Sequence, residues 1–340
     1  MTDKIDIAVV GASTTVGEAL IEILEERNFP LAKLYLVDNE AAAGGRVNCY
    51  GKSLKIEKIT SFDFSKVKLA IFSSTEALSK EYVEKAASLG CIVIDRTPAF
   101  RQDNDVPLVI PEVNAEALES YSKKNIISSP SANTIQLLLA LKPIHNAVAV
   151  KRINISTYQS VSGSGKDAAE ELASQTAALL NFRDVKCKTY PKQIAFNVLP
   201  QIGDFYDNGY TDEEMKIVHE TQKVLNDVSI KVNPTTVRVP VFIGHSAVVH
   251  VETGEKISAA KARDLLQQGK GLDLLDTHKV GGWPTPVTEA AGNDAVYVGR
   301  VREDISTEAG LNMWIVSDNI RKGGALNCVQ IAEILVKLYL

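Results

Sequence analysis

The sequence lacks the features that mark membrane proteins, nucleic-acid-binding proteins and disulfide-rich proteins. No stretch approaches the roughly 18 uncharged apolar residues that span a bilayer as a helix. The net charge is -5, and no run of basic residues is interleaved with aromatic ones, so we expect neither a nucleic-acid partner nor a membrane partner. The four cysteines lie far apart without a C-x-x-C pair, which argues against a disulfide framework and a structural zinc site.

What remains is the composition of an ordinary protein with two domains. The chain has 340 residues, 45% of them hydrophobic and 23% charged, which is enough to bury a full core. The N-terminal residues lead into a short apolar strand and do not form a charged-then-apolar secretion signal. We therefore expect a cytoplasmic protein whose thiols are reduced and mostly buried.

Residues 1–130 alternate short apolar runs with amphipathic stretches, the pattern of a Rossmann-type, doubly wound parallel sheet in an α/β fold. Residues Val16–Glu26 carry apolar side chains three to four positions apart, which predicts a helix with one buried face. A second crossover helix is predicted over Ser79–Leu89. The predicted strands are Ile5–Val10, Leu34–Val37, Leu69–Phe72, Ile92–Ile94 and Ile126–Ser128.

From Arg152 onward the pattern changes to that of an α+β domain. Strands are predicted over Arg152–Tyr158, Val237–Ile243 and Ser246–Glu252, and helices over Gly165–Asn181 and Glu213–Leu225. The last stretch, Gly324–Leu340, predicts a helix that packs back on the first domain. The expected division is a dinucleotide-binding domain over 1–132, a substrate and dimerisation domain over 133–318, and a returning helix over 319–340.

A glycine-containing turn, Gly11–Gly17, follows the first strand and opens the first helix, where a dinucleotide pyrophosphate would rest on backbone N–H groups. The turn keeps its first and last glycines, but the central position that should permit close backbone approach is Thr14. A plain strand-to-helix turn explains the pattern equally well. Asp38, at the end of the second strand, is placed either to accept from a ribose hydroxyl or to cap a turn.

Eight segments together resemble the aspartate-β-semialdehyde dehydrogenase family, and the similarity runs essentially from end to end. The resemblance implies a Rossmann domain, a catalytic and dimerisation domain, a homodimer, and a role in amino-acid biosynthesis in which aspartyl phosphate becomes the semialdehyde with NADPH. The segments are Phe29–Pro30, Asp95–Arg101, Val106–Asn114, Thr134–Gln136, Ser156–Gly163, Gln193–Asn197, Arg238–His245 and Asp318–Lys322.

The position of the family's nucleophile is the main departure. Family members carry a cysteine in the motif N-P-N-C-[ST]-T, and its thiolate attacks the substrate carbonyl before hydride moves to or from the nicotinamide. This chain has Ser-Pro-Ser-Ala-Asn-Thr over 129–134, so Ala132 replaces the cysteine. Ser131 is adjacent but projects from a different backbone position, and none of the four cysteines aligns with the site. A methyl group cannot attack a carbonyl.

The positions that hold the substrate in the family are all filled with suitable residue types, which implies a small anionic ligand resembling an amino acid. Taken singly, these residues also suit plainer roles: Arg101 and Arg238 as surface ion-pair partners, and Glu213 with Lys216 as an i,i+3 pair on a helix. By resemblance, Arg238 would pair with an α-carboxylate and Glu213 with an α-ammonium. The remaining assignments are Arg101 and Lys216 to a phosphate, Gln159 to orientation of the reacting group and His245 to acid/base work.

The cofactor positions, by contrast, depart from the family pattern. The resemblance implies NADP or NAD, but the arginine for the 2'-phosphate falls at Ala41, and a Gly-Gly pair near the diphosphate aligns with Thr75 and Glu76. Arg96 stands where the family has asparagine, and it either offsets Glu76 or takes over a phosphate contact. The residues assigned to the cofactor are Gly11, Ser13, Thr14, Val16, Gly17, Asp38, Ser73 and Asn319.

This combination is similar to the Usg-type paralogues of the dehydrogenase, which commonly lack the cysteine. Our leading hypothesis is a homodimer that keeps the anion site and has lost, or nearly lost, the redox reaction. Two alternatives stay open: a working NAD(P)-dependent dehydrogenase with another route, and a non-catalytic scaffold that forms heterodimers with the genuine enzyme. We expect no metal, because His245 and His250 lie on opposite faces of a predicted strand.

Overall fold

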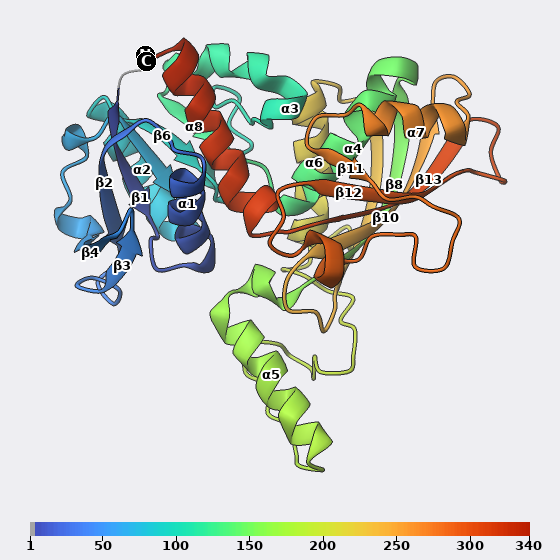
Figure 1. Ribbon diagram of the computed structural model, residues 1–340, viewed down its shortest axis with the longest axis horizontal. Coiled ribbons are helices and arrows are strands. Elements are labelled where there is room, and N and C mark those ends of the chain that lie inside the picture. The colour runs from blue at the N-terminus through green and yellow to red at the C-terminus, as the bar shows by residue number, and fades with distance from the viewer. Residues whose placement is uncertain (1–3) are drawn as a thin grey trace. The chain divides into compact units, whose positions relative to one another are not determined.

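The structure is a computed structural model that describes residues 4–340, and the chain folds into two units (Figure 1). The first unit comprises the described residues up to Ser131 together with Gly324–Leu340, and the second comprises Ala132–Gly323. The first boundary therefore lies one residue before the expected one. The chain returns to the first unit at residue 324, five residues later than expected.

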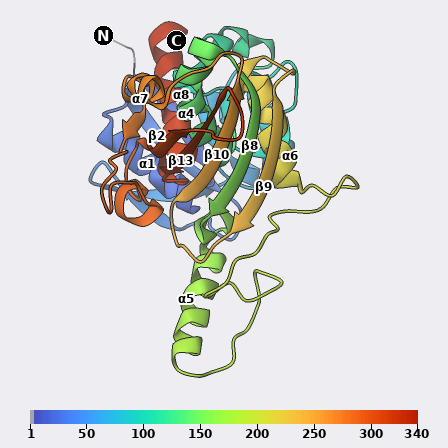
Figure 2. The same cartoon turned by 90° about the vertical axis from the view of Figure 1, so that its right-hand side faces the viewer.

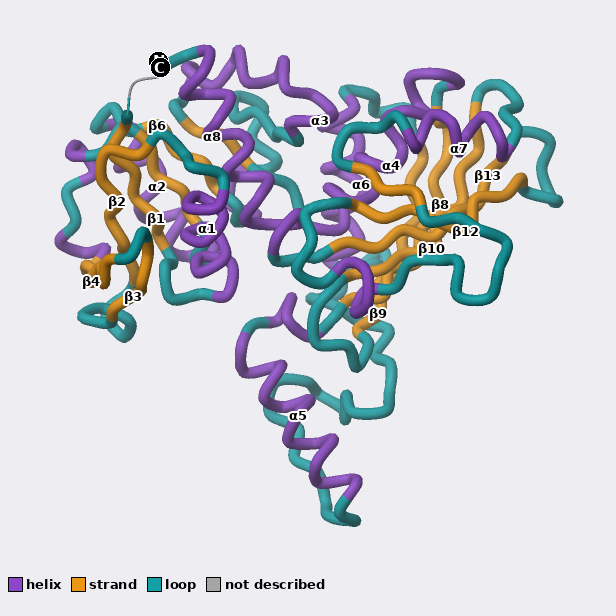
Figure 3. The backbone as a smooth tube through the Cα atoms, in the orientation of Figure 1, coloured by secondary structure: helices purple, strands orange, loops and turns teal. Residues whose placement is uncertain are grey.

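The first unit is built on a seven-stranded sheet, which Figure 3 shows in orange. Its strands are parallel except for one antiparallel hairpin at the edge, and their spatial order is β3-β4-β2-β1-β5-β6-β7. The five predicted strands are all present, and three of them have the predicted bounds. The strands are β1 (Ile5–Val10), β2 (Leu31–Asp38), β3 (Arg46–Cys49), β4 (Lys52–Lys58), β5 (Leu69–Phe72), β6 (Ile92–Asp95) and β7 (Ile126–Ser128).

The helices of the first unit include the two predicted crossovers and the returning C-terminal helix. The last helix begins later than predicted, because a π-helical turn over Arg321–Leu326 precedes it. Its contact with the first helix is confirmed, and Arg27 and Glu333 form an ion pair of 2.7 Å there. The helices are α1 (Thr15–Glu26), α2 (Glu76–Ser88), α3 (Pro111–Asn114) and α8 (Asn327–Leu338).

The second unit is built on a six-stranded mixed sheet with the order β11-β12-β13-β10-β8-β9. The core of this unit joins the sheet to the helices α4, α6 and α7, which cover one face and leave the other open. The strands are β8 (Val150–Gln159), β9 (Lys231–Arg238), β10 (His245–Thr253), β11 (Leu272–Leu274), β12 (Val296–Glu303) and β13 (Gly310–Ser317). The helices are α4 (Ala132–Val148), α5 (Lys166–Leu180), α6 (Asp212–Leu225) and α7 (Ala259–Gln267).

One predicted strand of the second unit is wrong. The segment Val237–Ile243 was expected to be extended, but β9 ends at Arg238 and irregular chain follows up to β10. Pro240 has no N–H to donate to a sheet, and Gly244 turns the chain with a φ of +95°. This turn places Arg238 at the end of β9 and His245 at the start of β10, on either side of β8.

Helix α5 and the loop after it form an arm that projects from the sheet of the second unit (Figures 1 and 2). The helix predicted over Gly165–Asn181 is present as α5, one residue shorter at each end. A small apolar cluster of its own, including Leu172 and Ile194, holds the arm together. Gln175 fastens the loop to the helix: its Oε1 accepts from the backbone N–H groups of Ile194 and Ala195 at 3.0 and 3.2 Å.

No helix within residues 4–340 is both long enough and apolar enough to cross a membrane.

Candidate functional site

The glycine turn of the first unit is packed tightly against the loop after β5. Gly11 has a φ of +86°, and a Cβ at this position would lie 2.6 Å from the carbonyl oxygen of Ser73. A Cβ at Gly17 would lie 2.0 Å from the carbonyl oxygen of Gly11. Both glycines are therefore required by the close approach of α1 to the sheet, as in dinucleotide-binding turns.

Thr14, at the centre of this turn, is the N-cap of α1. Its hydroxyl accepts from the N–H of Gly17 at 3.0 Å and lies 2.8 Å from the carbonyl oxygen of Gly11. The side chain thus satisfies one of the helix N–H groups that an anion would otherwise contact. The N–H groups of Thr15 and Val16 have no acceptor inside the helix, because they belong to its first turn.

Asp38 plays the turn-capping role, one of the two that the sequence allowed. Its Oδ2 accepts from both the N–H and the hydroxyl of Ser13, at 2.9 and 2.7 Å, and its Oδ1 accepts from the N–H of Asn39 at 2.8 Å. The side chain is buried. Both carboxylate oxygens are engaged within the protein, so a ribose contact would have to compete with the bond to Ser13.

Three of the substituted cofactor positions, Ala41, Thr75 and Glu76, are exposed. Ala41 lies in the turn after β2 and offers no charge. Thr75 is the N-cap of α2, where its hydroxyl accepts from the N–H of Leu78. Glu76 begins α2 and forms an ion pair of 2.6 Å with Lys80. The negative charge of Glu76 is therefore partly balanced within its own helix.

Two arginines of the first unit lie near one buried carboxylate. Arg96 donates from Nε to the hydroxyl of Ser73 at 3.3 Å, and Arg101 donates to the carbonyl oxygen of Arg96. Asp95 accepts from Thr97 and Ser79, while burial raises the pKa of this carboxyl. Burial also lowers the pKa of Arg96. Ser73 belongs to the loop that packs against Gly11, so Arg96 lies beside residues that we assigned to the cofactor.

In the second unit, Ala132 is the first residue of α4. Its Cβ faces Gly323, where an added Cβ would lie only 2.4 Å away. The next residue, Asn133, is 1% exposed and donates from Nδ2 to Glu213 Oε1 at 3.0 Å. The position assigned to a nucleophile therefore carries a packed methyl group beside a buried polar cluster.

Glu213 is the centre of that cluster. Besides Asn133, Gln159 donates from Nε2 to the same Oε1 at 3.3 Å. Lys216 lies 2.6 Å from Asp212 and 3.8 Å from Glu213, so its closer partner is Asp212. The structure thus brings Gln159 and Glu213 together and holds Lys216 one helical turn away on α6.

Arg238 and His245 form the other side of the cluster. Arg238 is 5% exposed and donates from a terminal nitrogen to the carbonyl oxygen of Ser160 at 2.7 Å. Burial lowers the pKa of its guanidinium, while Tyr190 and Glu213 act in the opposite direction. A Cβ at Gly163 would lie 3.0 Å from the Arg238 nitrogen and 3.3 Å from His245 Cε1, so only glycine leaves space between both groups and the chain.

His245 is a neutral imidazole with a defined tautomer. The backbone N–H of Ser160 donates to its Nδ1 at 3.2 Å, so the ring proton resides on Nε2. Burial lowers the pKa of His245 to about 3, and the charge of Arg238 acts in the same direction. At neutral pH the ring can donate a hydrogen bond from Nε2, and protonation of Nδ1 is costly.

Asn319, assigned to the cofactor by resemblance, lies in the second unit beside His245. Its Oδ1 accepts from the N–H of Gly244 at 2.9 Å and from the hydroxyls of Ser160 and Ser162 at 3.1 and 3.2 Å. These bonds fix the backbone immediately before His245. A contact with a cofactor remains a prediction.

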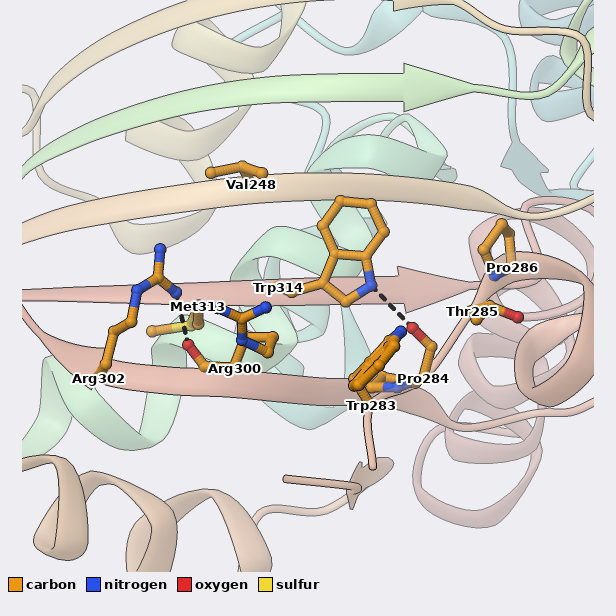
Figure 4. A pocket seen from close by; sticks show the side chains of 9 residues that line it. All are labelled: Val248, Trp283, Pro284, Thr285, Pro286, Arg300, Arg302, Met313 and Trp314. Atoms are coloured by element: carbon orange, nitrogen blue, oxygen red, sulfur yellow. Dashed lines mark hydrogen bonds between the residues drawn. The ribbon is translucent and has the colours of Figure 1, made fainter. Parts of the chain in front are cut away.

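The open face of the second sheet carries an apolar pocket, shown in Figure 4. Trp314 donates from its indole N–H to the carbonyl oxygen of Pro284 at 2.8 Å, and Trp283 stands beside this pair. Val248, on β10, alternates with buried residues of the core and so points to this face. Val248 and Trp283 are 38% and 39% exposed, an unusual amount for large apolar side chains that are grouped together.

The comparisons with known proteins agree with this division into two functional halves. Residues 6–121 match the family model described as semialdehyde dehydrogenase, NAD binding domain, and residues 141–322 match semialdehyde dehydrogenase, dimerisation domain. An aspartate-semialdehyde dehydrogenase of Shewanella violacea is 53% identical over 339 residues, which cover 100% of each chain. The chain belongs to the aspartate-semialdehyde dehydrogenase family.

Solved structures of the family support the same conclusion. Aspartate semialdehyde dehydrogenase II from Vibrio cholerae has a TM-score of 0.97 and 50% identity, covering 99% of this chain and 100% of its own. A second structure of that protein, with the same TM-score and identity, is described as complexed with ASA.

Within this family fold, sequence reasoning missed Asn133 and Ser160. Asn133 was noted only as part of an altered motif, although an amide in the first turn of a helix next to the nucleophile position is itself a signal of polar contact. Ser160 adjoins Gln159 in a matched segment, and only the fold shows that its backbone and hydroxyl lie against His245.

The structure also bears on metal binding and on the state of the thiols. Among residues 4–340, no group of three or more His, Cys, Asp and Glu side chains is placed to hold a metal ion. His250 pairs with Asp304 on the face of β10 opposite to His245. Burial raises the pKa of Cys49 and Cys328 to about 11 and that of Cys91 to about 12, which keeps these thiols protonated at neutral pH.

Proposed function

We propose that this member of the aspartate-semialdehyde dehydrogenase family binds a small amino-acid-like anion without forming a covalent bond to it, and that its dehydrogenase activity is lost or very weak. The observation that carries the proposal is Ala132 at the start of α4, directly beside a complete polar cluster. The three buried thiols have raised pKa values, and Cys187 is exposed on the arm, so no activated sulfur is available to replace the missing one.

The ligand class follows from the charges of the second unit. Arg238 offers a buried guanidinium for a carboxylate, and Glu213 offers a carboxylate for an ammonium. An α-amino acid such as aspartate or its semialdehyde, with one α-carboxylate and one α-ammonium, matches both. The Vibrio cholerae relative described as complexed with ASA supports this class. Arg101 and Lys216 are our candidates for a second anionic group such as phosphate.

The residues of the first unit fit a dinucleotide only in part. The packing at Gly11 and Gly17 and the N–H groups of Thr15 and Val16 suit a pyrophosphate. When bound, the nicotinamide would supply or accept hydride. Ala41 offers no cation to a 2'-phosphate, so we expect weak binding of either NAD or NADP and no preference for NADP.

We also infer that the open face of the second sheet binds a second copy of the chain. The family model for this region is described as a dimerisation domain, and the grouped exposure of Trp283, Val248 and Trp314 gives an apolar surface for it. Light scattering of the wild type and of Trp283→Glu tests this: we expect a dimer and a shift toward monomer, and a wild-type monomer contradicts the inference. Co-expression with the relative that retains the cysteine shows whether mixed dimers form.

The decisive test is the activity of purified protein with aspartate semialdehyde, phosphate and NADP or NAD, followed by absorbance of the reduced cofactor. Removing the nucleophile of a covalent mechanism typically costs on the order of a million-fold in rate, so we expect no measurable turnover from the wild type. Turnover at ordinary dehydrogenase rates, about 1 s⁻¹ or more, contradicts the proposal and favours a working dehydrogenase with another route.

The variant Ala132→Cys, alone and with Ser131→Asn, tests whether the missing thiol is the only reason for the loss of dehydrogenase activity. Restored activity shows that the rest of the site is intact, whereas Ala77→Cys, which places a thiol on the exposed surface of α2, is the control that should stay inactive. Calorimetric titration with L-aspartate tests the binding half independently, and absence of heat at millimolar ligand contradicts it.

A further inference from the structure

Asn133 holds a buried hydrogen-bond acceptor that nothing in the second unit uses. The side chain is 1% exposed, and its Oδ1 has no hydrogen-bond partner among the described residues. Buried polar atoms almost always have partners, so a lone acceptor in a site marks the place of a missing donor. The residue follows Ala132 in the first turn of α4.

The orientation of the Asn133 amide is fixed by chemistry. An ionised carboxylate only accepts hydrogen bonds, so the atom that lies 3.0 Å from Glu213 Oε1 must be the amide nitrogen. The same argument orients Gln159, whose Nε2 also donates to Oε1. Oδ1 of Asn133 is therefore a carbonyl oxygen held beside Glu213 by the geometry of the amide, and a flipped amide would place two acceptors against each other.

The neighbouring cation also has unused capacity. Arg238 is 5% exposed, and its Nε has no hydrogen-bond partner among the described residues, while one terminal nitrogen donates to Ser160. The site thus offers a donor with a positive charge on one side and, on the other, a carboxylate and a carbonyl oxygen. A ligand that satisfies all of them carries a carboxylate and a group with at least two N–H donors.

We infer that Asn133 is a specificity-determining residue that selects ligands with a primary ammonium, because its Oδ1 accepts one ammonium N–H while Glu213 accepts another. The inference rests on the proposed ligand site and refines it to α-amino acids. A serine or threonine, the residue types in the family motif at this position, has a single hydroxyl oxygen on a shorter side chain, whereas the amide donates to Glu213 from one atom and accepts from the ammonium with another.

The test compares L-aspartate with succinate, the same dicarboxylate without the amine, by calorimetry on the full chain. We expect the wild type to bind L-aspartate at least about tenfold more tightly than succinate. In Asn133→Thr the affinity for L-aspartate should fall about tenfold, while that for succinate stays the same. An unchanged succinate affinity also shows that the variant is folded and its Arg238 side intact.

The matched control is Asn154→Thr, the same substitution on β8, where Asn154 contacts His250 on the sheet face opposite to the ligand site. This variant should keep the wild-type ratio of the two affinities. Asn133→Thr overturns the inference if it keeps the ratio as well, since Oδ1 then holds only water, or if it loses both ligands equally, since its role is then structural.

Titration of the wild type alone distinguishes the role of Asn133 from the existence of the proposed anion site. Equal binding of L-aspartate and succinate overturns the role of Asn133 and leaves the proposed anion site standing. Binding of neither ligand overturns both.

Discussion

The two units differ in how deeply their functional positions are buried. In the second unit Arg238, His245 and Asn133 are each at most 5% exposed; Asn133 donates to Glu213, while Arg238 and His245 both bond to Ser160. In the first unit three of the positions that we expect to depart from the family pattern, Ala41, Thr75 and Glu76, are exposed, whereas Thr14 and Arg96 are half-buried.

Burial affects how readily a functional position can be substituted. Removing one member of a buried charged cluster strands its partner without solvent, which typically costs several kcal/mol, whereas exposed substitutions cost little. A binding site made of surface turns can therefore be altered one residue at a time, and a buried one cannot. Ala132 and Asn133 are departures within the buried half, and the methyl group of Ala132 leaves no polar partner behind.

The largest expected effect is that of Arg238→Ala on ligand binding. Loss of a buried guanidinium removes the partner of the ligand carboxylate and leaves Glu213 without a compensating charge, so we expect the Kd for L-aspartate to rise about a hundredfold or more. Arg238→Lys should recover part of this, because lysine keeps the charge without the fork. A change of less than about threefold would place the ligand elsewhere.

A second effect concerns the neutral His245. In the unfolded chain the imidazole takes up a proton as the pH falls through 6.5, but in the folded protein it does so only near pH 3. The free energy of unfolding therefore decreases as the pH is lowered from 6.5 toward 3. Between pH 7 and pH 5 this group should account for a loss of about 2 kcal/mol. Urea unfolding should show that loss in the wild type and not in His245→Gln; equal pH dependence in the two proteins contradicts a buried neutral ring.

The exposed cofactor positions can be tested by restoring the residue types that the family resemblance implies. The triple variant Ala41→Arg, Thr75→Gly and Glu76→Gly restores a cation and a flexible pair, and should bind NADPH about tenfold more tightly than the wild type by nucleotide fluorescence. Glycine still serves as an N-cap at position 75 at a cost of only a few tenths of a kcal/mol. Glu81→Gly removes the same charge from the same helix and should change nothing. An unaffected triple variant would place the obstacle at Thr14 or Asp38.

The smallest effect is expected for Gly163→Ala. The added Cβ would lie 3.0 Å from the Arg238 nitrogen, and a shift of a few tenths of an ångström relieves the contact at a cost of about 1 kcal/mol. We expect the Kd for L-aspartate to rise about fivefold, measured by the same titration as for Arg238. Unaltered affinity would show that the ligand does not depend on the space between Arg238 and His245.

The sequence sufficed for the elements that are buried on both faces. Strands β1, β5 and β7 are mostly apolar and buried, interrupted only by Asp6 and Ser128, and their predicted bounds match the structure. The hairpin of β3 and β4 was missed, because Ile56 is the one buried residue in the polar segment of β4. The segment Val237–Ile243 was predicted to be a strand because it is rich in apolar residues. In the structure most of these residues flank the turn between β9 and β10.

The contacts of the site could not be read from the sequence for a different reason. Asp38 and Ser13 are 25 residues apart, and Asn133 and Glu213 are 80 residues apart. Residue types and motifs name candidates for a site, but only the fold decides which donor meets which acceptor. The resemblance supplied Arg238, Glu213 and His245; it could not supply Asn133, because the family motif has no amide there.

The way Gln175 closes the α5 arm has a consequence for how this region can vary. The Gln175 carboxamide holds the N–H groups of Ile194 and Ala195 and the carbonyl oxygen of Lys186, and Glu171 accepts from the N–H groups of Lys188 and Thr189. The stretch 181–185 lies between the end of α5 and these anchor points. Residues can be inserted into or deleted from that stretch without unpairing any strand. The arm is thus the part of the molecule in which new recognition sequences can be accommodated while the sheet behind it stays the same.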